Sequence, residues 1–334
     1  MVLPYYTGRP RQAPAQAPAP LPLSRRAVQN NPAGYMADKG LVDAVNVALL
    51  LGQPLLLTGE PGTGKTQLAS SVAWELGYGA PLVFETKSTS SARDLFYIYD
   101  TLGRFHSAQT REGSQRSLDY ITFNALGLAI LRSNEESAVR HLLSEDFVHD
   151  GPQRSVVLID EVDKSPRDFP NDLLNEVEGM YFKIPELGNV KVSAREEMRP
   201  VLIITSNSEK HLPDAFLRRC TYYNIPFPEK LRLAQIVMTR VSGFPSSRGT
   251  LLSDALDFFS KLREPGSGLR KRPATAELLG WLVALRESGA HPDQSLREIS
   301  EITSSTLSAL VKSADDQTSA KAILDDWLKY SAQN

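Results

Sequence analysis

The sequence contains one cysteine, Cys220, among 334 residues. A single cysteine excludes an intramolecular disulfide and a zinc site built from cysteines, and it favours a reducing setting. The five histidines do not show the spacing of metal ligands. Apolar runs are short, and none approaches the roughly 18 residues that a membrane-spanning helix needs. We therefore expect a cytoplasmic protein without a membrane segment.

The sequence also lacks an excess of charge of either sign. Lys and Arg number 37 against 39 Asp and Glu, which gives a formal net charge of −2. The global charge therefore gives no reason to expect a nucleic-acid partner, although it does not exclude a local basic patch. With 41% hydrophobic and 23% charged residues, the composition is typical of a globular protein that is long enough for two domains.

Proline is concentrated at the start of the chain. Six of the 22 prolines lie in the first 23 residues, interleaved with Ala and Gln. This stretch lacks the apolar core of a secretory signal. We expect residues 1–28 to be a disordered leader, although the same composition also suits a docking peptide for an aromatic groove.

The rest of the chain changes character once. Short apolar strands alternate with helices up to about residue 228, which predicts a mostly parallel sheet covered by helices. Beyond that point only helical patterns follow. We therefore expect an α/β core at residues 29–228 and a helical lid domain at residues 229–334. The predicted strands are 54–58, 82–86, 155–160, 201–206 and 221–225, and a helix at 36–51 precedes the first. The predicted lid helices are 229–241, 251–262, 273–286, 293–311 and 319–330.

The first strand runs into a complete GxxxxGK[ST] pattern, and helical apolar spacing follows it up to Gly77. Glycines let successive amide N–H groups turn toward an anion, and the helix N-terminus adds a partial positive charge. We expect Lys65 to contact the β- and γ-phosphates of a nucleoside triphosphate and Thr66 to coordinate Mg²⁺. The predicted nucleotide-binding residues are Gly59, Glu60, Pro61, Gly62, Thr63, Gly64, Lys65, Thr66 and Gln67.

A second apolar strand, residues 155–160, ends in the carboxylates Asp160 and Glu161. Such a pair suits metal-dependent hydrolysis. Asp160 would hold Mg²⁺ through its water shell, and Glu161 would orient and polarise the attacking water. Two carboxylates that stand alone also suit a turn cap, but the phosphate-loop pattern elsewhere in the chain favours hydrolysis.

Together these segments resemble the AAA+ ATPases, and within them the MoxR-like group, over residues 29–290. The resemblance includes residues 160–164, the helix at 169–176 and the strand at 201–207. It implies a P-loop three-layer αβα core with a five-stranded parallel sheet, followed by a smaller all-helical lid. It also implies that Asn207, at the sensor 1 position, lies near the γ-phosphate and the water, and an amide that both donates and accepts suits that place.

The same resemblance assigns an arginine finger to residues 213–220, which would reach the nucleotide of a neighbouring subunit. Arg219 is the first candidate and Arg218 the second, because one of two adjacent arginines can bridge to a carboxylate of its own subunit. A planar guanidinium suits phosphate oxygens. Residues 268–277 resemble the sensor 2 region, where Arg270 or Arg272 would contact the phosphates. This segment departs from the commonest MoxR pattern, so Lys271 stays open as well.

Two further stretches are candidates for specialised roles. Residues 86–100 and the polar segment after them resemble the place where MoxR-like proteins insert a hairpin that faces the pore of the ring, which makes them a candidate partner-contact loop. Residues 181–184 and 190–193 alternate like the strands of a hairpin. We expect its aromatic residue Phe182 to lie in the core.

The resemblance implies an ATP hydrolase that uses Mg²⁺, assembles as a homo-oligomeric ring, expected to be a hexamer, and remodels or activates a partner protein. In the MoxR-like group that partner is typically a von Willebrand factor A domain protein. Two alternatives of other classes use the same core, namely a nucleic-acid or defence-type motor and a regulatory switch with little turnover. The neutral charge and the absence of a DNA-reading element argue against the motor.

Overall fold

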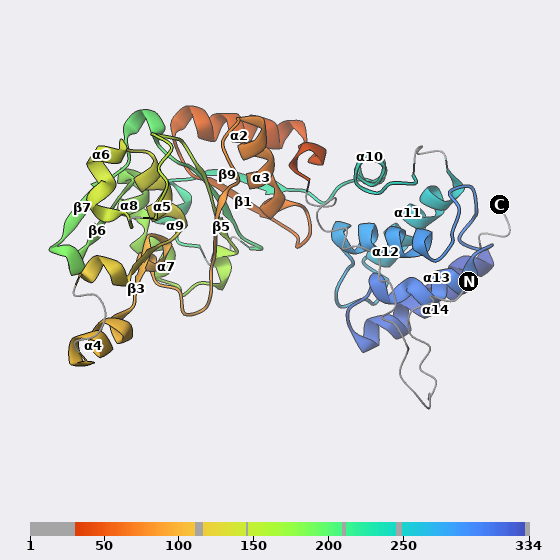
Figure 1. Ribbon diagram of the computed structural model, residues 1–334. Coiled ribbons are helices and arrows are strands. Elements are labelled where there is room, and N and C mark those ends of the chain that lie inside the picture. The colour runs from red at the N-terminus through yellow and green to blue at the C-terminus, as the bar shows by residue number, and fades with distance from the viewer. Residues whose placement is uncertain (1–30, 111–115, 145, 209–211, 245–248, 331–334) are drawn as a thin grey trace, which may run out of the picture. The chain divides into compact units, whose positions relative to one another are not determined.

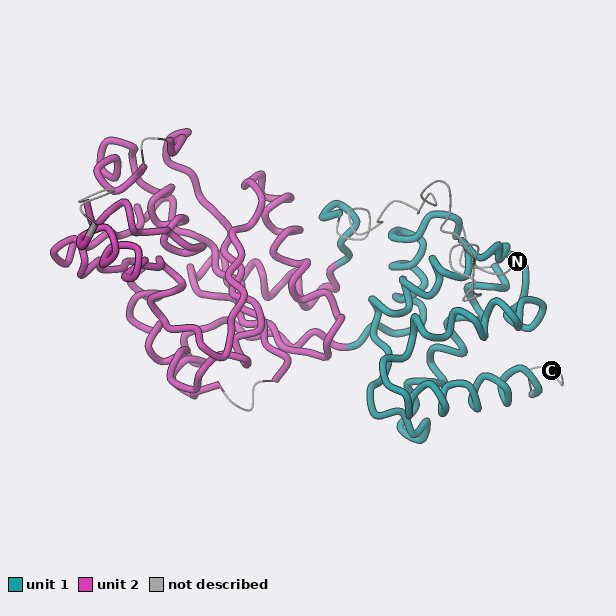
Figure 2. The backbone as a smooth tube through the Cα atoms, turned by 60° about the horizontal axis from the view of Figure 1, so that its bottom comes forward, with its two compact units in different colours: residues 1–36, 227–334 teal, residues 37–226 magenta. Residues whose placement is uncertain are grey.

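The computed structural model describes residues 31–110, 116–144, 146–208, 212–244 and 249–330. The predicted leader at residues 1–28 lies outside this part of the chain. Two compact units make up the fold, one of residues 37–226 and one of residues 1–36 with 227–334 (Figure 2). We refer to them as the sheet unit and the helical unit. No described helix is both long and apolar enough to cross a membrane.

The sheet unit contains a five-stranded sheet in the order β2-β5-β8-β1-β9, and every pair of neighbouring strands is parallel. Figure 1 labels β1, β5 and β9 of this sheet. All five predicted strands are present, and the parallel α/β architecture is confirmed. Burial of the central strands explains their apolar composition, since three successive leucines of β1 are at most 2% exposed. The strands are β1 (Leu55–Gly59), β2 (Leu82–Glu85), β5 (Val156–Asp160), β8 (Val201–Thr205) and β9 (Thr221–Ile225).

Helices flank the sheet. α2 packs against β1 and β9, α3 against β1, β5 and β8, and α5 against β2 and β5. α2 begins three residues later than predicted, because the side chain of Asp38 caps it by accepting the N–H of Leu41. It ends at Leu51 as predicted, and the C-cap Gly52 is left-handed. The helices are α2 (Lys39–Leu51), α3 (Lys65–Glu75), α4 (Thr101–Thr110), α5 (Ala125–Arg132), α6 (Glu136–Val139), α7 (Phe169–Asp172), α8 (Leu174–Gly179) and α9 (Asp214–Leu217).

Two small antiparallel hairpins complete the sheet unit. β3 (Tyr97–Tyr99) pairs with β4 (Ile121–Phe123), and β6 (Tyr181–Ile184) pairs with β7 (Val190–Ser193), as predicted for the second hairpin. Phe182 is 1% exposed, which confirms it as a core residue. Its ring packs against Phe96, Tyr97 and Phe123, so one aromatic cluster joins the two hairpins. The hydroxyl of Tyr97 also donates to Glu186 of the second hairpin's turn at 2.8 Å.

The helical unit has its own apolar core, built from α10 to α14. The helix predicted at residues 293–311 is present only in part, because it begins seven residues later than predicted, at Ser300. The backbone N–H of Leu296 donates to Asp254 of α11 and that of Ser295 to Glu298, so the chain turns here and becomes helical only at Ser300. The elements are α10 (Lys230–Arg240), α11 (Thr250–Arg263), α12 (Thr275–Glu287), α13 (Ser300–Thr306), the 3₁₀ turn Leu307–Ala309 and α14 (Ala314–Tyr330).

The predicted boundary at residue 29 assigned residues 31–36 to the α/β core. In the structure these residues cluster with the helical unit. Arg240 of α10, which is 7% exposed, donates to the carbonyl of Asn31 at 2.9 Å. The hydroxyl of Thr239 contacts the sulfur of Met36 at 3.6 Å. These tertiary contacts leave no signal in the local sequence pattern.

Candidate functional site

The loop between β1 and α3 needs glycine at several positions. Gly59, Gly62 and Gly64 have φ of 137°, 77° and 90°, which residues with a Cβ rarely adopt. A Cβ on Gly59 would also lie 2.5 Å from the carbonyl oxygen of Ile225 on β9. Gly64 is the N-cap of α3 and offers no side-chain acceptor to the first turn. The loop therefore presents a helix N-terminus whose N–H groups suit an anion.

Lys65 is a buried cation that contacts carbonyl groups. Its Nζ donates to the carbonyls of Gly59 at 2.8 Å and Glu60 at 3.0 Å, and the residue is 7% exposed. It forms no ion pair with any carboxylate in the described ranges. Burial lowers the pKa of Lys65, and the nearby carboxylates Asp163, Asp160 and Glu161 partly oppose that shift. An ammonium group has three donors, so one remains for a phosphate.

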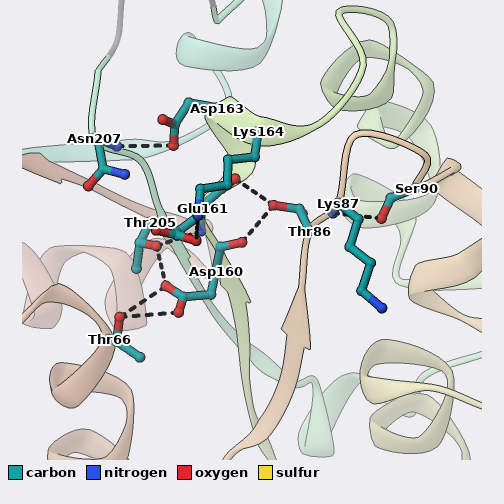
Figure 3. A network of polar contacts seen from close by, with 10 residues as sticks. All are labelled: Thr66, Thr86, Lys87, Ser90, Asp160, Glu161, Asp163, Lys164, Thr205 and Asn207. Carbon is teal, nitrogen blue, oxygen red and sulfur yellow. Dashed lines mark hydrogen bonds and ion pairs between the residues drawn. The ribbon is translucent and has the colours of Figure 1, made fainter. Parts of the chain in front are cut away.

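Thr66 and Asp160 lie next to each other at the same edge of the sheet (Figure 3). The Thr66 hydroxyl donates to both carboxylate oxygens of Asp160, at 3.0 and 3.2 Å. Because its hydrogen points at Asp160, its lone pairs stay available to a cation. Among the described residues, no group of three or more His, Cys, Asp and Glu side chains could hold a metal. These two residues fit Mg²⁺, which commonly takes its other ligands from phosphates and water.

Glu161 directly follows β5 in a left-handed conformation, with φ of 56° and ψ of 49°. That conformation costs a residue with a Cβ roughly 1–2 kcal/mol. Hydroxyls at the ends of both neighbouring strands contact this turn. Thr86, after β2, donates to the carbonyls of Asp160 and Glu161, and Thr205 of β8 accepts the Glu161 N–H at 2.9 Å.

The Glu161 carboxylate pairs with Lys164, three residues later. Both side chains are about half exposed, at 42% and 55%. Such exposed pairs contribute only about 0–1 kcal/mol. A water molecule can therefore take the place of Lys164 at the Glu161 carboxylate at little cost.

Asn207 follows the end of β8, and its backbone N–H donates to Asp163 at 3.1 Å (Figure 3). Its side-chain amide forms no hydrogen bond with the part of the chain that is described. The structure thus places Lys65, Thr66, Asp160, Glu161 and Asn207 at the carboxyl ends of β1, β5 and β8. Ligands of open parallel sheets bind at this edge.

The two candidate finger residues differ in their contacts. Arg219 pairs with Glu178 at 3.0 Å and donates to the carbonyl of Ala215 at 3.1 Å. Arg218 is exposed and forms no ion pair with a described residue. Since the Arg219 pair is also exposed, at 43% and 66%, it holds the guanidinium only weakly.

The candidate sensor 2 residues belong to the helical unit. Asp316 accepts the backbone N–H groups of Arg270 at 2.8 Å and Lys271 at 3.3 Å, and these bonds lower the pKa of Asp316. The Arg270 guanidinium pairs with Asp315 at 3.2 Å, whereas Arg272 is exposed and forms no ion pair with a described residue. Asp316 therefore holds the backbone of this segment.

Two residues of the site, Thr86 and Thr205, were not among the predicted site residues. Each is a buried threonine at the end of a strand, which is an ordinary residue in such a place. Only the order of the strands brings both hydroxyls to the turn at Asp160 and Glu161. In the sequence, a polar residue at the end of each apolar strand was the available indication of such a role.

A glycine-built phosphate loop beside two carboxylates on one sheet edge is the arrangement of a P-loop nucleotide hydrolase. Residues 55–227 match the family described as "ATPase family associated with various cellular activities (AAA)". This match covers more than half of the chain, so the protein belongs to the AAA family of ATPases. A comparison with curated proteins finds no match.

The solved structures to which the chain is similar include a branch migration motor. The RuvB Holliday junction branch migration motor of Thermotoga maritima is 17% identical, with a TM-score of 0.43, over 84% of this chain and 69% of that chain. A mutant of the same protein has a TM-score of 0.45 at 17% identity, over 84% of this chain and 70% of that one.

Proposed function

We propose that this AAA ATPase is MoxR-like, assembles as a homo-oligomeric ring, expected to be a hexamer, and uses ATP and Mg²⁺ to remodel or activate a partner protein. Glu161 activates the attacking water, and Asp160 with Thr66 holds the metal. Lys65 and Asn207 contact the phosphates and the water. We also propose a cytoplasmic setting, which the single cysteine favours. Partial burial raises the pKa of Cys220 to about 12, so that thiol is expected to be unreactive.

The position of Arg218 and Arg219 is the observation that carries the ring proposal. β9 pairs with β1 in parallel, with Thr221 opposite Leu55 and Ile225 opposite Gly59. The two arginines precede Thr221, so they lie at the amino edge of the sheet, whereas the phosphate loop follows its carboxyl edge. At about 3.3 Å per residue, the strand alone separates the two edges by about 13 Å. This separation favours action on the nucleotide of another subunit.

The partner class is proposed from the resemblance to MoxR-like proteins. A von Willebrand factor A domain protein is the expected substrate. The segment from β3 to β4 supports a contact role, because Ile98, Leu102 and Phe105 are 50%, 82% and 62% exposed. Addition of such a protein from a neighbouring gene is expected to stimulate ATP hydrolysis.

Mixing two inactive variants tests whether the finger acts between subunits. Glu161→Gln subunits keep their arginines but do not activate water, and Arg219→Ala subunits keep Glu161 but lack the finger. In a mixed ring, an Arg219→Ala subunit beside a Glu161→Gln subunit has a complete site. The mixture is expected to hydrolyse ATP faster than either variant alone, and the same mixture with Arg218→Ala shows which arginine acts.

Lys65→Ala mixed with Glu161→Gln is the matched control, because both residues belong to one site and no subunit of that mixture is complete. Rates equal to the average of the separate variants in the arginine mixtures would contradict the ring. Stimulation by DNA that weakens with salt would instead indicate the nucleic-acid motor. Tight ATP binding with almost no turnover in the wild type would indicate the regulatory switch.

A further inference from the structure

Thr205 is the last residue of β8 and is 1% exposed. β8 lies between β1 and β5, with Thr205 opposite Leu57 on one side and Ile204 opposite Ile159 on the other. The next residue of β5 after Ile159 is Asp160. Thr205 is therefore a buried hydroxyl directly beside the acidic pair.

The hydroxyl of Thr205 makes two contacts at once. It donates to one carboxylate oxygen of Asp160 at 2.5 Å, and it accepts the backbone N–H of Glu161 at 2.9 Å (Figure 3). A hydroxyl has one hydrogen and two lone pairs, so both bonds form together. The same oxygen of Asp160 also accepts the Thr66 hydroxyl at 3.0 Å. A chain of hydrogen bonds thus runs from Thr66 through Asp160 and Thr205 to Glu161.

The two bonds act on different features of the acidic pair. The bond to Asp160 fixes how that carboxylate is turned toward Thr66. The bond from Glu161 occupies an N–H that lies beyond the last paired residue of β5, and it supports the left-handed backbone of Glu161. By contrast, among the described residues the hydroxyl of Thr86 bonds only to the backbone carbonyls of this turn.

We propose that Thr205 is a positioning residue for ATP hydrolysis, because one hydroxyl sets both the metal-side carboxylate of Asp160 and the backbone that carries Glu161. This inference rests on the roles proposed above for Asp160 and Glu161. Partners that orient metal-binding carboxylates typically contribute about 10–100-fold to metal affinity or activity. Thr205 acts through these two residues and needs no contact with ATP.

Thr205→Val removes the hydroxyl and keeps the branched shape, whereas Thr205→Ser keeps the hydroxyl. In the full-length protein, Thr205→Val is expected to lower kcat about 10–100-fold and to weaken the Mg²⁺ dependence of fluorescent ATP-analogue binding. Binding of the analogue in EDTA is expected to stay within about twofold of wild type, because the phosphate loop is unchanged. Hydrogen exchange at the Glu161 amide is expected to become faster, and Thr205→Ser is expected to restore all three properties.

Thr303→Val is the control for a lost buried hydroxyl, since Thr303 is 0% exposed and its hydroxyl donates to the carbonyls of Leu296 and Ile299 in the helical unit. It is expected to leave kcat unchanged. Wild-type kcat and Mg²⁺ dependence in Thr205→Val, or equal losses in Thr205→Ser, would overturn the inference. If Thr205→Val does not fold, Thr205→Ala against Thr205→Ser gives the same comparison. Normal hydrolysis by Glu161→Gln would instead refute the proposed function itself.

Discussion

At the scale of single residues, the charged groups of the site are held by contacts that leave them available to a nucleotide and its attacking water. Lys65 donates to two loop carbonyls, and Glu161 pairs with the exposed Lys164. Burial that lowers the pKa of Lys65 means that the fold disfavours its charge. A phosphate next to Lys65 would favour the charged form again. Nucleotide binding would therefore relieve a cost that the nucleotide-free protein carries.

Lys65→Ala tests this view of the phosphate loop. The variant loses a charge-assisted contact to phosphate, which is worth about 1.5–3 kcal/mol, so the affinity for a fluorescent ATP analogue is expected to fall by about 10–100-fold or more. Lys261→Ala removes an exposed lysine of α11 that pairs with Glu264, and it is expected to bind normally. Equal affinities of the two variants would refute the loop assignment.

The residues with a motif were predictable from the sequence, and those without one were not. The GxxxxGK[ST] pattern around Lys65 and Thr66 is enough to predict a phosphate loop, because the spacing of residues within one loop is a local property. Thr205 and Thr86 join the site only through the sheet, since their strands are the neighbours of β5. The pairing of Arg219 with Glu178 is likewise a contact between distant segments.

At the scale of elements, local pattern predicted the strands well because their central residues are buried on both faces and thus continuously apolar. The helix expected at 293–311 begins only at Ser300, for a physical reason. Leu296 and Ile299 have helical spacing and are buried, yet the backbone N–H of Leu296 bonds to Asp254 of α11. Helical spacing of apolar residues indicates that they are buried together, and here residues in a turn are buried at the same spacing.

The aromatic cluster that joins the two hairpins gives a prediction for an element. Phe182 contacts the rings of Phe96, Tyr97 and Phe123, so Phe182→Ala leaves a cavity between the hairpins. We expect it to lower the free energy of unfolding by about 3–5 kcal/mol in urea denaturation. Phe105→Ala is the matched control, because that ring on α4 is 62% exposed and its loss is expected to cost at most about 0.5 kcal/mol. Equal losses would mean that the cluster does not hold the hairpins together.

At the scale of the whole molecule, the two units have separate apolar cores that share no residue. Each unit also carries its own fluorescent reporter. Trp74 lies on α3 of the sheet unit, and Trp281 on α12 and Trp327 on α14 lie in the helical unit. Trp281 is fully buried, so its fluorescence follows unfolding of the helical unit, whereas Trp74 is 60% exposed and follows the sheet unit less strongly. Replacing Trp74 by Phe leaves tryptophan only in the helical unit.

Nucleotide binding then tests whether a sensor 2 arginine of the helical unit contacts the nucleotide that the phosphate loop binds. A slowly hydrolysed ATP analogue at about 100 times its Kd is expected to stabilise the sheet unit by about 2.7 kcal/mol, because it binds the folded state only. If a sensor 2 arginine contacts the phosphates, Trp281 reports stabilisation of the helical unit as well. We expect that second shift, and we expect Arg270→Ala or Arg272→Ala to abolish it while the shift of the sheet unit remains. If the analogue does not stabilise the helical unit of the wild type, neither arginine contacts the nucleotide.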